Sequence, residues 1–188
     1  MKWRGWVAGL AMSCLAPFAL AQDAGYYIAV DYGQTTFKDT CETLPGTGCR
    51  DDDLGSRFSL GYQFNRFISG EIGYFSPGKV ALPGGSGYVF TAKEWHYTAI
   101  LSVPLGKGYS VFGRGGAAIW DVTSSIKSTP GTAARETGVD VVWGGGFKYD
   151  ISSSMTILIQ YESHKAGEEL TTGRYDINFL SYGIKIKF

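Results

Sequence analysis

Alternation of apolar and polar residues is the dominant pattern of this chain after residue 24. Hydrophobic side chains recur at every second position, which is the period of a β-strand, and no sustained helical period follows the N-terminal segment. Each alternating segment is close to the roughly nine to eleven residues with which a tilted strand crosses a membrane. The pattern predicts eight strands, at residues 25–37, 55–64, 67–75, 92–103, 109–121, 138–150, 155–163 and 175–188.

Long and short connections alternate between the predicted strands. The longer ones are rich in Gly, Pro and polar residues and cover 38–54, 76–91, 122–137 and 164–174. The shorter ones are 65–66, 104–108 and 151–154. This alternation is typical of an up-and-down membrane barrel in which both termini lie at the end with the short turns.

The two faces of the predicted strands differ in charge. One face carries no charged residue along any strand; its Tyr and Trp residues gather near the strand ends, with aliphatic and small residues between them. The other face carries acids and bases in equal number, among Gly, Ser, Thr and Gln. These charged residues are Asp31, Glu71, Glu94, Asp140 and Glu162, and Arg57, Arg114, Lys148, Lys185 and Lys187.

A soluble barrel with its apolar face inward and its charges in water is the main alternative. The aromatic residues near the strand ends favour the opposite arrangement, because membrane barrels carry such girdles at both interfaces. The many glycines on the polar face also favour it, since they indicate a crowded interior. A charge facing lipid would cost about 2–4 kcal/mol near the membrane centre. We therefore predict an all-β fold, an eight-stranded antiparallel up-and-down transmembrane β-barrel.

The first 21 residues have the features of a cleaved signal peptide. Lys2 and Arg4 precede an apolar run over 5–20, and small residues flank a cleavage site before Gln22. An uncleaved membrane anchor is the alternative, but the run is short for a spanning helix and contains Pro17. We expect an exported protein with a barrel domain over 22–188.

The composition limits the possible functions. The 188 residues are enough for one domain, and 17 Lys and Arg balance 17 Asp and Glu, so no excess of positive charge points to nucleic acid. The 27 glycines and the aromatic content of 15% fit a β protein. Cys41 and Cys49 lie in a short Gly-, Pro- and Thr-rich stretch, and we predict a disulfide between them because export permits one.

Several stretches of the chain resemble the small outer-membrane barrels of the OmpA transmembrane-domain and OmpX type. They are residues 61–65 leading to 71–74, 112–120, 136–139 before 144–146, and 182–188. In the last stretch, Tyr182, Ile184, Ile186 and Phe188 resemble the C-terminal signal that the barrel-assembly machinery recognises.

This resemblance implies a place in the cell outer membrane, among its lipids and lipopolysaccharide. It also implies that the long loops face outside, where they can meet an extracellular ligand. Because the sequence ends at Phe188, we expect no peptidoglycan-binding domain after the barrel.

The interior of an eight-stranded barrel is just wide enough for its own side chains. By resemblance to the OmpA-type interior, we hypothesise that Glu71, Arg114 and Lys148 form a charge network that closes the lumen, and we expect Lys185 and Lys187 to be solvated at the rim. The function predicted is a structural or surface-interaction role. The alternative is that the charges lie in water near the lumen ends and the barrel is a narrow porin-like channel for ions or small solutes.

An outer-membrane enzyme that modifies lipid A is a third possibility. The candidates are His96 with Glu94, and His164 after Glu162, but Ala166 stands where the lipid A deacylase pattern has its serine. The three acids at 51–53 lack the alternating spacing of a calcium loop. We expect no catalytic residue, no metal and no cofactor.

Overall fold

A computed structural model describes residues 24–38, 52–81, 88–126, 134–166 and 175–188. The predicted signal peptide and the predicted Cys41–Cys49 disulfide lie outside these ranges. The described residues form strands and turns and contain no helix. In this part of the chain there is accordingly no helix that is long and apolar enough to cross a membrane.

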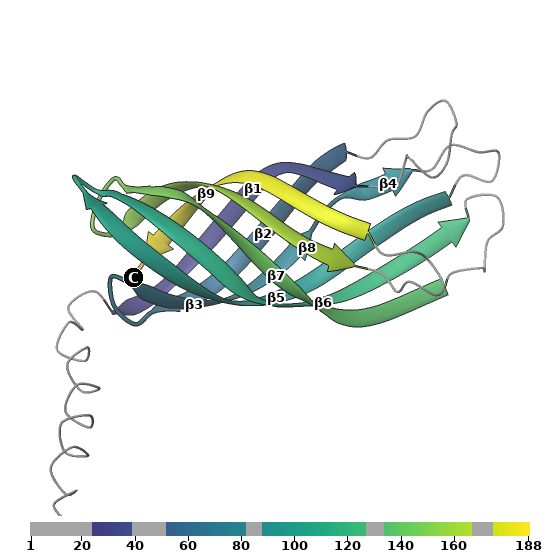
Figure 1. Ribbon diagram of the computed structural model, residues 1–188, viewed down its shortest axis with the longest axis horizontal. Coiled ribbons are helices and arrows are strands. Elements are labelled where there is room, and N and C mark those ends of the chain that lie inside the picture. The colour runs from purple at the N-terminus through teal and green to yellow at the C-terminus, as the bar shows by residue number, and fades with distance from the viewer. Residues whose placement is uncertain (1–23, 39–51, 82–87, 127–133, 167–174) are drawn as a thin grey trace, which may run out of the picture.

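The described residues form nine strands, eight of which close into an antiparallel barrel (Figure 1). Each barrel strand pairs with its neighbours in the chain, and β1 pairs with β9 to close the circle, while β3 pairs directly with β5 past the short β4. The strands are β1 Gly25–Lys38, β2 Asp52–Gln63, β3 Ile68–Ser76, β4 Lys79–Ala81, β5 Tyr88–Gly106, β6 Tyr109–Ile126, β7 Ala134–Asp150, β8 Met155–Ala166 and β9 Tyr175–Lys187.

All eight predicted strands are confirmed, and several are longer than the alternation indicated. The largest extensions are in β5, β6 and β7. The predicted connection 104–108 is mostly strand, because β5 continues to Gly106 and only Lys107 and Gly108 remain between β5 and β6. Backbone φ angles of 94°, 53° and 83° at Gly106, Lys107 and Gly108 make this tight reversal, which two glycines accommodate without strain.

The two ends of the barrel differ in their connections. The short turns β2–β3, β5–β6 and β7–β8 lie at one end, here called the short-turn end (Figure 1). The strands that flank the longer connections all end at the opposite, long-connection end. The first and last strands start and finish at the short-turn end, where the Phe188 amide donates to the Tyr26 carbonyl at 3.0 Å.

The outer surface of the barrel is apolar. Aliphatic side chains such as Val30, Leu60 and Ile72 point outward and are 51%, 50% and 50% exposed. Aromatic rings contact one another toward both ends of this band, as in the Tyr109–Tyr149 pair near the short turns and the Tyr74–Trp95 pair farther along. An apolar surface between two aromatic belts is the surface of a protein whose solvent is lipid.

The interior contains two different layers. Near the long-connection end, a cluster of apolar side chains fills the lumen; its members are Phe37, Phe75, Ala92, Trp120, Val122, Ile177 and Phe179. Below it, toward the short turns, the lumen holds buried charged and polar side chains. The predicted inversion, apolar outside and charged inside, is therefore correct, and the apolar inner layer is an addition that the alternation did not indicate.

Candidate functional site: the charged interior of the barrel

Arg57 connects two sides of the lumen. Its Nε and Nη2 atoms donate to Asp31 Oδ2 at 3.0 and 2.9 Å, and its Nη1 donates to Glu162 Oε2 at 2.5 Å. Asp31 is on the adjacent strand β1, but Glu162 is on β8, which β1 and β9 separate from β2. All three residues are at most 2% exposed. This ion pair therefore crosses the lumen between strands that are not neighbours in the sheet.

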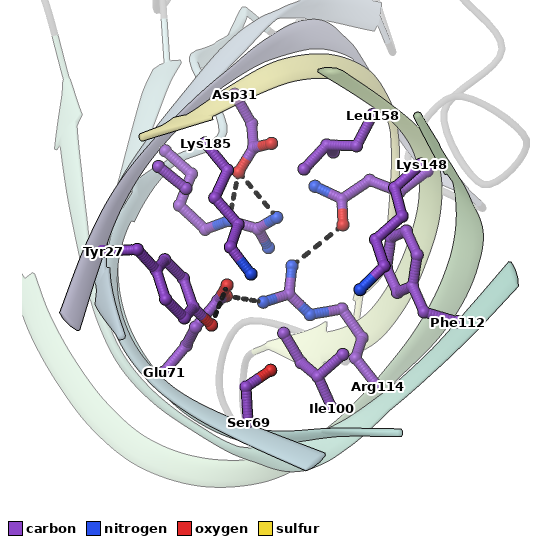
Figure 2. Close-up of a pocket in the computed structure, with 13 residues that line it drawn as sticks. Tyr27, Asp31, Ser69, Glu71, Ile100, Phe112, Arg114, Lys148, Leu158 and Lys185 are labelled. Carbon is purple, nitrogen blue, oxygen red and sulfur yellow. Dashed lines mark hydrogen bonds and ion pairs between the residues drawn. The ribbon is translucent and has the colours of Figure 1, made fainter. Parts of the chain in front are cut away.

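Arg114 makes a second crossing, nearer the short-turn end. Its Nη2 pairs with Glu71 Oε2, and its Nη1 donates to Gln160 Oε1 at 3.0 Å and lies 3.3 Å from Glu162 Oε2. The other oxygen of Glu71 accepts a hydrogen bond from the Tyr27 hydroxyl at 2.9 Å. Figure 2 shows Arg114 and Glu71 facing each other in the middle of the barrel. The two arginines thus meet at the Glu162 carboxylate.

Of the three residues predicted to form a network, the structure brings Glu71 and Arg114 together. Lys148 is on β7, the strand next to that of Arg114, and its Nζ donates to Ser102 Oγ at 2.9 Å. In the described part of the chain, no ion pair joins Lys148 to Glu71 or to another acid. The other ion pairs of the charged interior involve Arg57, Asp31 and Glu162. These three were assigned to the inward face from the sequence but were not singled out.

Lys185 corrects one expectation. It was expected to be solvated at the rim, yet it is only 9% exposed. Its Nζ lies 3.9 Å from the centre of the Tyr27 ring and donates to Gln63 Oε1 at 3.0 Å. The ammonium group thus lies against the face of the Tyr27 ring and beside the Gln63 oxygen, where the barrel interior borders the hollow at the short-turn end.

Two histidines and two glutamates form a separate cluster beside the apolar inner layer. Glu94 Oε2 lies 3.0 Å from His96 Nε2 and 2.7 Å from His164 Nε2. His96 Nδ1 lies 3.1 Å from Glu162 Oε1. All four residues are at most 1% exposed. The sequence places these residues in two separate pairs, and the barrel brings both pairs together because β5 and β8 face each other across the lumen.

The space left inside the charged layer is small. The cavity around Arg114 and Glu71 has a volume of about 20 Å³, which is room for roughly one water molecule. At the short-turn end the interior widens to a hollow of about 480 Å³, lined in part by Lys148, Lys185 and Lys187. The small cavity is lined by both arginines, so little space remains in the charged layer.

The residues of the predicted assembly signal lie on the lipid-facing side. Tyr182, Ile184 and Ile186 alternate along β9 with exposed fractions of 64%, 49% and 46%, and Phe188 follows the strand at 73%. Their recognition by the barrel-assembly machinery stays a prediction.

Comparison with known proteins agrees with this architecture. The chain is 27% identical to outer membrane protein A of Salmonella typhi over 195 residues, covering 100% of this chain and 56% of the relative. It thus spans about half the length of the curated relatives that it matches.

Two solved structures illustrate the shared fold. Neisserial surface protein A matches with a TM-score of 0.70 at 16% identity, covering 88% of this chain and 99% of that one. The attachment invasion locus protein Ail of Yersinia pestis, solved with the heparin analogue sucrose octasulfate, matches with a TM-score of 0.57 at 16% identity, covering 88% and 99%. The family model for the OmpA-like transmembrane domain matches residues 21–188, so the chain belongs to this family of outer-membrane β-barrels.

Proposed function

We propose that this protein is a closed outer-membrane barrel with a structural and surface-interaction role, and that its lumen does not conduct. The observation that carries the proposal is the pair of crossings made by Arg57 and Arg114, which meet at Glu162 inside the barrel. An open path through the barrel requires these side chains to separate.

Separation has a high energetic cost in this position. Separated inside the barrel, the arginines and carboxylates would be buried charges without partners, which is unfavourable. The closed state is therefore the resting state of the barrel in this proposal.

Solute flux through liposomes tests the proposal against the narrow-channel alternative. Liposomes containing the wild-type barrel are expected to exclude a small sugar as well as empty liposomes do. A variant with Arg57→Ser, Arg114→Ser and Glu162→Ser, combined with Phe75→Ser and Phe179→Ser in the apolar inner layer, removes both obstructions and is expected to admit it. Lys165→Ser, which removes an exposed ion pair with Asp176 instead, is the matched control. Wild-type flux above that of empty liposomes would contradict the closed lumen.

We further propose that the long-connection end faces outside the cell, as in other outer-membrane barrels with short periplasmic turns. Its loops would then be the surface available to an extracellular ligand, and the fold shared with Ail supports such a role. An epitope inserted at 84–87 is expected to be detected on intact cells, whereas one inserted at 152–153 is not. Detection of only the second epitope would reverse the orientation.

We also propose that the barrel is not a lipid A-modifying enzyme. His164 is 1% exposed and points into the lumen, away from the outer surface where lipid A lies. His96 is equally buried. We expect the mass of lipid A in cells that express the protein to equal that in cells that lack it, and a loss of acyl-chain mass would contradict this.

Two proposals concern maturation of the chain. Cleavage before Gln22 would give a mature protein of residues 22–188, and Cys41 and Cys49 would form a disulfide in it. Intact-mass measurement of the protein from outer membranes tests both. We expect the mass of 22–188 and alkylation of the two cysteines only after reduction; alkylation without reduction would contradict the disulfide.

A further inference from the structure

The structure assigns a divalent metal site to the cluster of Glu94, His96 and His164. One ligand atom from each of these residues lies within 4.8 Å of the other two. Two histidines and one carboxylate are a donor set that binds zinc in proteins. This site is independent of whether the lumen conducts, and the sequence did not predict it.

The distances are close to those that a single ion requires. Tetrahedral zinc with bonds of about 2.0–2.1 Å places its donor atoms about 3.3 Å apart. Glu94 Oε2 is 3.0 Å from His96 Nε2 and 2.7 Å from His164 Nε2. The two histidine nitrogens lie within 4.8 Å of each other. Binding of one ion would move the carboxylate oxygen outward and draw the two imidazoles together, with a fourth position left for water.

The hydrogen bonding of His164 supports this assignment. Its side chain is fully buried, yet neither ring nitrogen has a hydrogen-bond partner among the described residues. His164 Nε2 is therefore close to the Glu94 carboxylate, but the two groups are not aligned as in a hydrogen bond. Buried polar groups are almost always satisfied. An ion between the carboxylate and the imidazole satisfies both groups without that alignment.

His96 has the arrangement of a supported metal ligand. Its Nε2 lies 3.0 Å from Glu94 Oε2, while its Nδ1 lies 3.1 Å from Glu162 Oε1, which is ion-pair distance without the alignment of a hydrogen bond. Histidines that bind metal commonly direct the second ring N–H to a carboxylate, which fixes the ring and its tautomer. Glu162 is held in turn by Arg57 at 2.5 Å. Glu162 is thus a positioning residue that links the site to the charge network.

Charge balance also favours an ion here. Arg57 and Arg114 make ion pairs with Asp31, Glu162 and Glu71, which are two positive charges against three carboxylates. In the described part of the chain, Glu94 has no lysine or arginine partner, although it is 0% exposed, and its charged contacts are the two histidines. An unpaired buried carboxylate is costly. A divalent cation supplies the missing positive charge and leaves both histidines neutral, as metal binding requires.

Metal content after refolding tests the site directly. Untagged protein is refolded with excess Zn²⁺, freed of unbound metal and analysed; we expect about one zinc ion per chain. His96→Asn and His164→Asn are each expected to retain less than about a tenth of that. The control variants Lys165→Asn, next to the site but exposed, and Cys41→Ser with Cys49→Ser are expected to retain it fully.

A measurement on the wild type keeps the test decisive if the histidine variants do not refold. The chain contains 2 histidines, and both belong to this site, so histidine NMR signals report on it without ambiguity. We expect both imidazoles to shift when Zn²⁺ is supplied during refolding, and Co²⁺ in its place to give the visible absorption of a tetrahedral complex. Wild-type protein that refolds without bound metal and with unshifted histidine signals would overturn the proposal, as would full zinc content in both histidine variants.

Discussion

Replacement of Arg57 by methionine is the change that tests the charge network most severely. Methionine keeps much of the length and apolar volume of the arginine stem, so the main loss is the guanidinium group. That group makes three contacts, two with Asp31 and one with Glu162, and its side chain is 1% exposed. In Arg57→Met both carboxylates therefore stay buried while their shared cation is absent.

The magnitude follows from the burial of the pair. Removing one partner of a buried ion pair costs about 3–5 kcal/mol, because the remaining charge is uncompensated. This is a large part of the roughly 5–15 kcal/mol that stabilises a typical domain. In Arg57→Met, Asp31 loses its cation, while Glu162 keeps Arg114 at 3.3 Å. Adding Asp31→Asn and Glu162→Gln neutralises both carboxylates, and we expect this triple variant to recover most of the loss. The order of stability is the prediction: wild type and triple variant above Arg57→Met.

Urea titration in lipid vesicles measures this order, with tryptophan fluorescence and the heat-modifiable gel shift as independent probes of the folded barrel. Lys165→Met is the matched control, because its ion pair with Asp176 has a distance of 3.3 Å but side chains that are 51% and 36% exposed. Exposed pairs contribute only about 0–1 kcal/mol. An Arg57→Met barrel within about 1 kcal/mol of the wild type, or a triple variant less stable than Arg57→Met, would refute the reasoning.

Two further changes test the inner and outer faces. In Gly61→Ala the added methyl group overlaps ring atoms of Tyr27, and overpacking of this kind typically costs about 1–3 kcal/mol. In the control Gly115→Ala the methyl group meets no atom within 4 Å, so we expect unchanged stability in the same urea titration. Leu60→Lys, at the middle of the lipid face of β2, is expected to destabilise the barrel in vesicles by about 2–4 kcal/mol, and Leu54→Lys, near the end of the same strand, by about 0–1 kcal/mol; equal costs would contradict the membrane position assigned to this face.

The sequence was sufficient for the strands and for their two faces. Period-two alternation defines which side chains share a face, and the absence of charge from one face identifies lipid as its solvent. The strand ends were less accurate, since β5 continues through Pro104 to Gly106 and β7 begins at Ala134, before the predicted start at 138. Pro104 and Gly106 are typical of turns, and residues 135–137 are polar, so both ends resemble loops in sequence. The pairing that extends them is set by the neighbouring strands.

Contacts between side chains across the lumen could not be predicted from the sequence. Which inward residues meet depends on the tilt and stagger of the strands, which alternation does not determine. Arg57 and Glu162 are 105 residues apart, and nothing in their local sequence relates them. For the same reason the sequence did not show that His96 lies beside His164. It also did not show that Lys185 lies against the ring of Tyr27 on the adjacent strand, so the expectation of a solvated Lys185 was wrong.

Single-channel recording in a planar bilayer tests the central claim most directly. The wild-type barrel, shown to be folded by its heat-modifiable gel shift, is expected to show no stable open level. The serine variant that lacks Arg57, Arg114 and Glu162, together with Phe75 and Phe179 of the apolar layer, is expected to show discrete openings. A long-lived unitary conductance of the wild type, similar to that of the variant, would contradict a lumen closed by its buried ion pairs.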